Sequence, residues 1–230
     1  MEAENSRKRI IELLSTKSVA KHEVYKNTLK TFNMIKDHMQ EFTLDLEKQL
    51  SDFDQKIRFS FREKGQFEME FKVAGDLILV TMHTNVFEFP KSHAVRQNSY
   101  VKDDPMRAYS GIISIYNFLA DSFKYNRLND VGYLIGRIFI NKDMHFIVEG
   151  KRQFGFLFND LSSQVIDQNN IKIIMEAAIQ YAIDFDLLVP PYNQVQTVSV
   201  QEMNNITSSI SLKTGKSLGF NYKALSSDIK

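Results

Sequence analysis

Two residues near the middle of the chain have the types and the spacing of half of a metal-dependent nuclease site. Glu149 and Lys151 are two positions apart in the segment MHFIVEGK, so on a β-strand both side chains point to the same face. There a carboxylate can hold a divalent cation, and an ammonium group can steady the phosphate under attack. The full PD-(D/E)xK arrangement also needs a second carboxylate that binds the same cation.

The place of that second carboxylate depends on how residues 131–150 fold. If Lys142 and Asp143 form a two-residue turn between antiparallel strands, Gly136 lies opposite Glu149, and no acid occurs there. Asp130 would lie about 20 Å further along the strand, at about 3.3 Å per residue. The sequence therefore favours a charged strand end. A helix over residues 131–140 would remove this test, so the nuclease using Glu149 and Lys151 stays open as the alternative function.

A second group of candidate residues lies in the long connection between residues 84 and 110. This segment contains two of the four prolines and shows no clear hydrophobic period. Connections of this length inside a compact domain are often functional. We expect it to be a contact surface for a protein partner or a small polar ligand, through these side chains: His93, Arg96, Tyr100, Lys102, Asp103 and Asp104.

Other catalytic patterns each lack a required member. The five histidines form no HExxH pair, and no GxSxG turn occurs. The TGKS segment at residues 214–217 has Ile210 where a phosphate-binding loop needs its first glycine. The chain has no cysteine, which excludes disulfides, thiolate catalysis and cysteine metal sites. We therefore predict no cofactor and no metal, and favour a protein that is not an enzyme.

Charge and hydropathy limit the partners. The 29 basic and 28 acidic residues give a net charge of +1, too little to draw the chain onto nucleic acid or an anionic membrane. Basic residues near the N-terminus keep nucleic-acid binding as a second alternative: Arg7, Lys8, Arg9, Lys17, Lys21, Lys26 and Lys30. The first residues lack a signal-peptide pattern, and no segment has about 18 consecutive apolar residues. We expect a cytoplasmic protein without membrane association.

The elements that position these residues begin with N-terminal helices. From Ser18 to Phe53 there is no glycine or proline, and apolar residues recur every third or fourth position, as on one face of a single helix. We expect Phe32, Met39 and Leu46 to be buried against a sheet. A helix this long can extend past the domain and offer a surface to a partner. Alternatively, its row of apolar residues could pack against a second copy of the chain in a homodimer.

After residue 54 the hydrophobic period changes from 3.6 to 2. Alternation on both sides of Lys64 and Gly65 predicts a β-hairpin with Arg62 facing Glu70, followed by a central strand at residues 77–83. The remaining segments are interpreted as a helix at 112–123, with a strand as the alternative, strands at 133–141, 145–150 and 154–158, and a helix at 162–187 entered at Asp160 or Ser162.

These elements predict an α+β fold with N-terminal helices, one of them long, a mostly antiparallel sheet in two meanders, and a C-terminal helix covering one face. We divide the chain into an N-terminal helical segment (1–53), an α+β core domain (54–191) and a polar tail (192–230) that is partly disordered or docked. The function that fits this pattern is a non-enzymatic cytoplasmic binding or regulatory protein that acts through protein or small-ligand surfaces.

Overall fold

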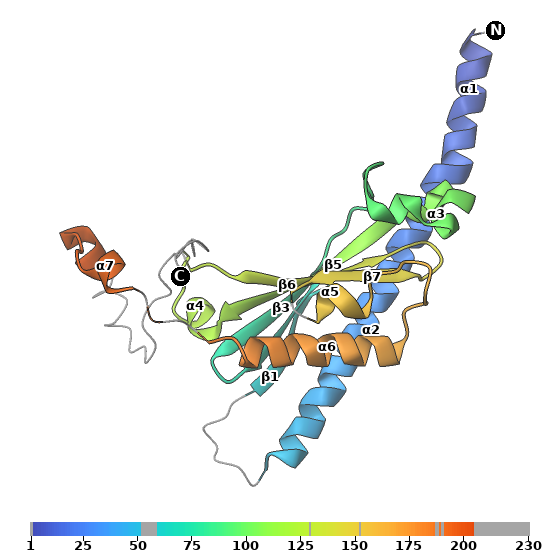
Figure 1. Cartoon of the computed structure of the whole chain (residues 1–230). Coiled ribbons are helices and arrows are strands. Elements are labelled where there is room, and N and C mark those ends of the chain that lie inside the picture. Colours follow the sequence, from blue (N-terminus) through green and yellow to red (C-terminus); the bar gives the residue numbers. More distant parts are fainter. Residues whose placement is uncertain are drawn as a thin grey trace.

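The protein has an α+β fold in which a long N-terminal helix and later helices accompany a seven-stranded antiparallel sheet (Figure 1), and this confirms the predicted class. The structure, a computed structural model, describes residues 2–51, 59–128, 130–151, 153–186, 189 and 191–204. The predictions for Phe53, for the first residues of the hairpin and for the tail beyond residue 204 lie outside these residues.

The N-terminal helix is one continuous rod. α1 (Glu2–Leu13), a π-helical turn η1 (Leu14–Ser18) and α2 (Val19–Gln49) follow one another without a break. Ser18 has helical backbone angles, so the helix runs through it. Phe32 and Met39 are buried as predicted, whereas Leu46 is only partly buried. No helix in the described part of the chain is long and apolar enough to cross a membrane.

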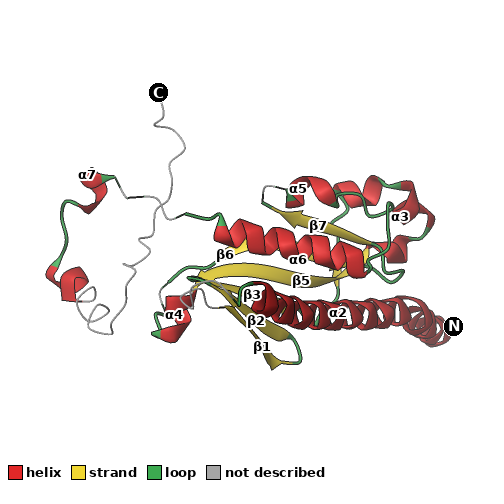
Figure 2. Ribbon diagram, turned by 90° about the horizontal axis from the view of Figure 1, so that it is seen from below, coloured by secondary structure: helices red, strands yellow, loops and turns green. Residues whose placement is uncertain are grey.

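The sheet is a meander whose neighbouring strands follow one another in the chain (Figure 2). Its order is β1-β2-β3-β5-β6-β7, and β4 pairs with β5 beside this path. The strands are β1 (Phe59–Gly65), β2 (Glu68–Val73), β3 (Asp76–Met82), β4 (Phe87–Glu88), β5 (Tyr109–Leu119), β6 (Tyr133–Ile140) and β7 (Phe146–Gly150). Arg62 pairs with Glu70 across the hairpin, and β3 lies inside the sheet, as the sequence predicted.

Two predicted elements were wrong. Residues 109–119 form β5, so the strand that was kept as the alternative is confirmed and the favoured helix over 112–123 is wrong, since only α4 (Ala120–Lys124) is helical there. Ile113 and Ile115 are fully buried between β3 and β6, an environment that favours β-branched residues in a strand. Residues 154–158 contain the short helix α5 (Phe154–Leu157) instead of a strand. Phe154 of this helix is buried, so the hydrophobic run reflects packing and not strand pairing.

Two helices cover one face of the sheet and enclose the main core. α2 crosses the strands, and α6 (Gln168–Ile183) lies beside it on the same face (Figures 1 and 2). The predicted entry of α6 at Asp160 or Ser162 was wrong. The helix begins after Asp167, because the Asp167 and Asn170 side chains bond each other's backbone N–H groups in a capping box.

The long helix touches the sheet most closely at β5. A Cβ added to Gly111 would lie 2.0 Å from Thr28 Oγ1, so no other residue type fits there without movement. Asn27, the residue before Thr28 on α2, donates hydrogen bonds from its side chain to the carbonyl oxygens of Asn141 and Lys142, at 3.1 and 2.6 Å. These contacts fix the rod against β5 and against the turn between β6 and β7.

Candidate binding surfaces

The connection between residues 84 and 108 is folded and covers part of the second face of the sheet. It contains β4, the 3-10 turns η2 (Ala94–Gln97) and η3 (Pro105–Ala108), and the short helix α3 (Ser99–Asp103). Side chains from this segment and from the sheet share a second hydrophobic cluster, whose buried members are Phe89, Val95, Val101, Ala108, Phe139, Ile147 and Leu161. His93, Asn98 and Asp104 accept hydrogen bonds from backbone N–H groups at the start of the three turns. The segment is therefore ordered by its own caps and by apolar burial.

Two of the six predicted loop residues anchor this segment to the β6–β7 turn. The Tyr100 hydroxyl and Arg107 Nε both donate to Asp143 Oδ2, each at 2.9 Å. Lys142 Nζ lies 3.0 Å from Asp104 Oδ2 and 3.0 Å from Asp143 Oδ1. We call these five residues the turn network. Tyr100 and Asp104 thus have structural partners within the chain.

We expect the turn network to make the free energy of unfolding depend on pH. Burial disfavours the charged form of Asp143, but hydrogen bonds from Lys142, Tyr100 and Arg107 outweigh it and hold its pKa below the ordinary value. Stability from such a carboxylate is fully present above its unfolded pKa of about 3.9 and is lost as the pH falls through the lower folded value. We expect urea denaturation to give a larger free energy of unfolding at pH 7 than at pH 3, with a smaller difference in Asp143→Asn. The exposed control Asp103→Asn should match the wild type; equal pH dependence in both variants would contradict the assignment.

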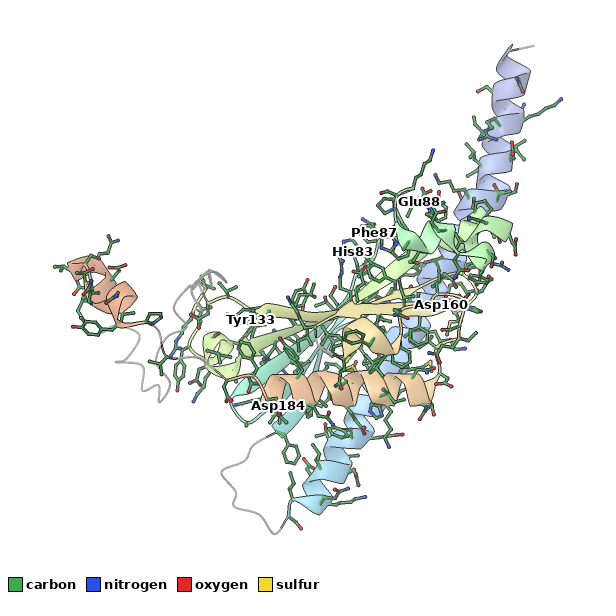
Figure 3. The ribbon with its side chains drawn as sticks, viewed as in Figure 1. His83, Phe87, Glu88, Tyr133, Asp160 and Asp184 are labelled. Atoms are coloured by element: carbon green, nitrogen blue, oxygen red, sulfur yellow. The ribbon has the colours of Figure 1, made fainter. Side chains whose placement is uncertain are left out.

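The other loop residues point elsewhere. Arg96 forms an ion pair with Glu88, which is labelled in Figure 3, and its Nε donates to the carbonyl oxygen of Phe89 at 3.0 Å. Lys102 and Asp103 are exposed at the end of α3. The six candidate residues therefore do not converge on one site.

His93 is the loop residue that meets the other candidate group. Its Nε2 lies 3.7 Å from Glu149 Oε1, and both line a hollow of about 510 Å³ beside β7. Asp160, labelled in Figure 3, lines the same hollow, and hydrogen bonds from the Ser162 backbone and hydroxyl hold its pKa below the ordinary value. We call this space the β7 hollow.

Glu149 is paired within the chain. Its Oε2 lies 2.5 Å from Arg137 Nη2, because the register places Arg137, and not Gly136, opposite Glu149. The predicted two-residue turn was wrong, because three residues lie between Asn141 and His145, whose backbones are joined by a hydrogen bond from Asn141 N–H to the His145 carbonyl. The side-chain oxygen of Asn141 also accepts hydrogen bonds from the backbone N–H groups of Asp143 and His145. The Lys151 side chain is exposed. Within the described ranges, no group of three or more acidic or histidine side chains is arranged to hold a metal ion.

A further surface lies on the N-terminal rod, which extends past the edge of the sheet (Figure 1). Four large apolar residues gather there on α1 and the first residue of η1, with exposed fractions between 40% and 59%: Ile10, Ile11, Leu13 and Leu14. We call these four residues the apolar stripe. Its neighbours in the sequence include the basic residues Arg7, Lys8, Arg9 and Lys17 and the acidic residues Glu4 and Glu12.

The apolar stripe continues toward the part of the rod that packs on the sheet. Lys17 Nζ and Lys21 Nζ each lie 5.4 Å from the ring centre of Tyr109, the first residue of β5. Leu13 lies about one helical turn before Lys17. The helix therefore carries apolar residues beyond the point where the sheet ends.

No protein-family model matches the chain, and neither the curated proteins nor the solved structures include a significant match. Function is therefore inferred from the surfaces of the chain itself.

Proposed function

We propose that this chain is a non-enzymatic binding protein that docks an acidic, amphipathic helix of another protein against its projecting N-terminal helix. The observation that supports this is the apolar stripe, in which four large aliphatic side chains lie together and remain 40–59% exposed. Contiguous exposed apolar groups of this kind mark interaction surfaces, whereas isolated ones are ordinary.

The free energy available at the apolar stripe suits a reversible complex. Burying a whole aliphatic side chain contributes about 1.5–3 kcal/mol, so four half-exposed side chains hold several kcal/mol. Association itself costs an estimated 4–15 kcal/mol. The stripe can therefore supply the central contact, while surrounding ion pairs must provide the remainder and the specificity.

The charges beside the apolar stripe indicate the kind of partner. Glu12 is paired with Arg9 at 2.8 Å, and among the side chains that the structure describes, which begin at Asn5, none forms an ion pair with Arg7 or Lys8. A helix with acidic residues beside an apolar face complements this surface, as in helix-in-groove recognition. Two copies of α1 would instead bring like charges together, which argues against self-association through the stripe.

The β7 hollow is a weaker candidate for the main function. Its Glu149 is already bonded to Arg137, and Asp160 accepts hydrogen bonds from Asn98 and Ser162. A ligand there would have to replace contacts that already satisfy both carboxylates. The alternative function, a nuclease that uses Glu149 and Lys151, needs Glu149 to bind a metal ion. Its pairing with Arg137 therefore argues against that alternative.

Site-specific photo-crosslinking in cells that make the full chain tests the proposal. A benzoylphenylalanine at Ile10 should give one discrete heavier product, and one at Asn5, on the opposite side of α1, should not. Adding Leu14→Asp should abolish the Ile10 product without lowering the melting temperature, because Leu14 is 59% exposed. The crosslinked protein, once identified, should bind the purified chain through a helical segment with acidic residues.

Three outcomes would contradict the proposal. The Ile10 position could give no product, or a product that consists of two copies of this chain. Alternatively, the purified chain could bind vesicles of anionic lipid with the same dependence on Leu14, which would make the partner a membrane surface.

A further inference from the structure

A second hollow, with a different charge, lies at the other end of the sheet. Its volume is about 520 Å³, and residues of β1, β2, β3 and α4 line it. Four of its lining side chains are cationic, Arg62, Lys64, Lys72 and Lys124, and one is a carboxylate, Glu70. We call it the basic hollow, and we infer that it binds a small phosphorylated ligand.

The strand register explains why these charges gather. Arg62 on β1 lies opposite Glu70 on β2, and Lys72, two residues further along β2, shares the face of Glu70. The residues opposite Lys72 are Ser60 on β1 and Leu77 on β3, so neither neighbouring strand supplies an acid there. In the described part of the hairpin, Lys72 therefore has no acidic residue directly opposite it.

Glu70 cannot neutralise the whole basic hollow. Its side chain is only 7% exposed, and its two oxygens lie 2.7 Å from Arg62 Nη2 and 2.8 Å from Lys64 Nζ. Burial disfavours its charge, but the hydrogen bonds from Lys64 and Arg62 outweigh this and hold its pKa below the ordinary value. Lys64 also lies 3.4 Å from Glu68, which is outside the lining. The lining therefore contains four cationic side chains and one carboxylate, and both oxygens of that carboxylate already lie beside Arg62 and Lys64.

The shape of the basic hollow suits a phosphate group attached to a small molecule. Its volume falls within the range of about 300–1,000 Å³ that is usual for small-ligand sites. Phosphate oxygens form strong charge-assisted hydrogen bonds with lysine and arginine. Phe123 adds a flat apolar wall: its ring is edge-on to Phe118 at 5.1 Å, 44% of the residue is exposed, and Lys64 Nζ lies 5.5 Å from its ring centre. A planar group such as a nucleobase has a surface to stack on.

Isothermal titration calorimetry of the full chain with pyrophosphate tests the inference. We expect saturable binding of one molecule per chain, weakened about tenfold or more in Lys72→Gln, since this variant removes one charge-assisted hydrogen bond. Lys102→Gln is the matched control, because Lys102 is exposed on α3, outside the lining, and its loss should leave affinity unchanged. Lys124→Gln replaces Lys72→Gln if the latter melts at a lower temperature than the wild type.

ADP in the same titration separates two sources of the phosphate. Tighter binding of ADP than of pyrophosphate, with the gain lost in Phe123→Ala, would support a nucleotide as the ligand. Equal affinity would support a phosphorylated ligand without a base. Absence of saturable binding by the wild type, or an equal affinity of the lysine variant in the hollow and the Lys102→Gln control, would overturn the inference.

Discussion

Gly111→Ala should lower the free energy of unfolding by about 3 kcal/mol, the upper part of the usual range for overpacking. The new Cβ would lie 2.0 Å from Thr28 Oγ1 and 2.8 Å from Thr28 Cβ. Thr28 is fully buried, and its hydroxyl donates to the Val24 carbonyl at 2.7 Å, so the side chain cannot rotate away freely. The clash is relieved only if α2 lifts from β5, which separates the main core. Urea denaturation measures the loss.

Gly155→Ala provides the matched control. The nearest atom to its added Cβ is the Gly150 carbonyl oxygen at 3.7 Å, an ordinary contact. Glycine in a helix costs up to about 1 kcal/mol relative to alanine, so this variant should be neutral or slightly stabilising. Combining Gly111→Ala with Thr28→Ala should recover part of the lost stability, because the two residues are in direct contact. Equal effects of the two glycine variants would mean that the close approach of α2 is not tight.

Phe154→Ala should lower the free energy of unfolding by about 3–5 kcal/mol, the range for buried phenylalanine. Phe154 is fully buried, and a Cβ added to Gly150 would lie 2.7 Å from Phe154 Cβ, which shows how closely α5 packs on β7. Phe156→Ala on the same helix changes the same residue type at a position that is 82% exposed, and should cost less than about 1 kcal/mol. The comparison is made by urea denaturation. Similar losses in both variants would show that α5 does not contribute Phe154 to the core.

The sequence predicted most reliably the elements whose hydrophobic period is regular. Apolar residues recur with a period of 3.6 along the long helix and with a period of 2 along the first hairpin, and the structure contains both elements. Ile112 and Ile115 fit a helical spacing of three, whereas Ile113 and Ile115 fit the strand spacing of two, and only pairing with β3 and β6 decides for a strand. The short helix α5 is likewise set by burial of Phe154, which local spacing does not reveal.

The candidate surfaces were harder to predict because they depend on register and on long-range contacts. The turn between β6 and β7 is one residue longer than predicted, so Arg137 lies opposite Glu149 where the sequence predicted Gly136. The Glu149 carboxylate is therefore paired and not free. The hydrogen-bond partners of Tyr100 are some 40 residues away in the chain, so the local sequence of the loop does not reveal that Tyr100 has a structural role. The sequence predicted a helix from Ser18 that was long enough to overhang the domain, but the projecting part is α1, which precedes Ser18. The exposure of the apolar stripe depends on where the sheet ends, near Tyr109 at the start of β5, and the local sequence does not specify that position.

The chain order of the sheet has a consequence for how the protein reaches its fold. Apart from β4, the strands pair in chain order, and the longest connection inside the sheet is the one between β3, which ends at Met82, and β5, which begins at Tyr109. Loop-closure entropy grows with the length of chain enclosed, and nearby pairings therefore form early and fast. The sheet can grow by adding strands outward from any hairpin. The late step is then the docking of the long helix, because the bonds from Asn27 to Asn141 and Lys142 close loops of 114 and 115 residues.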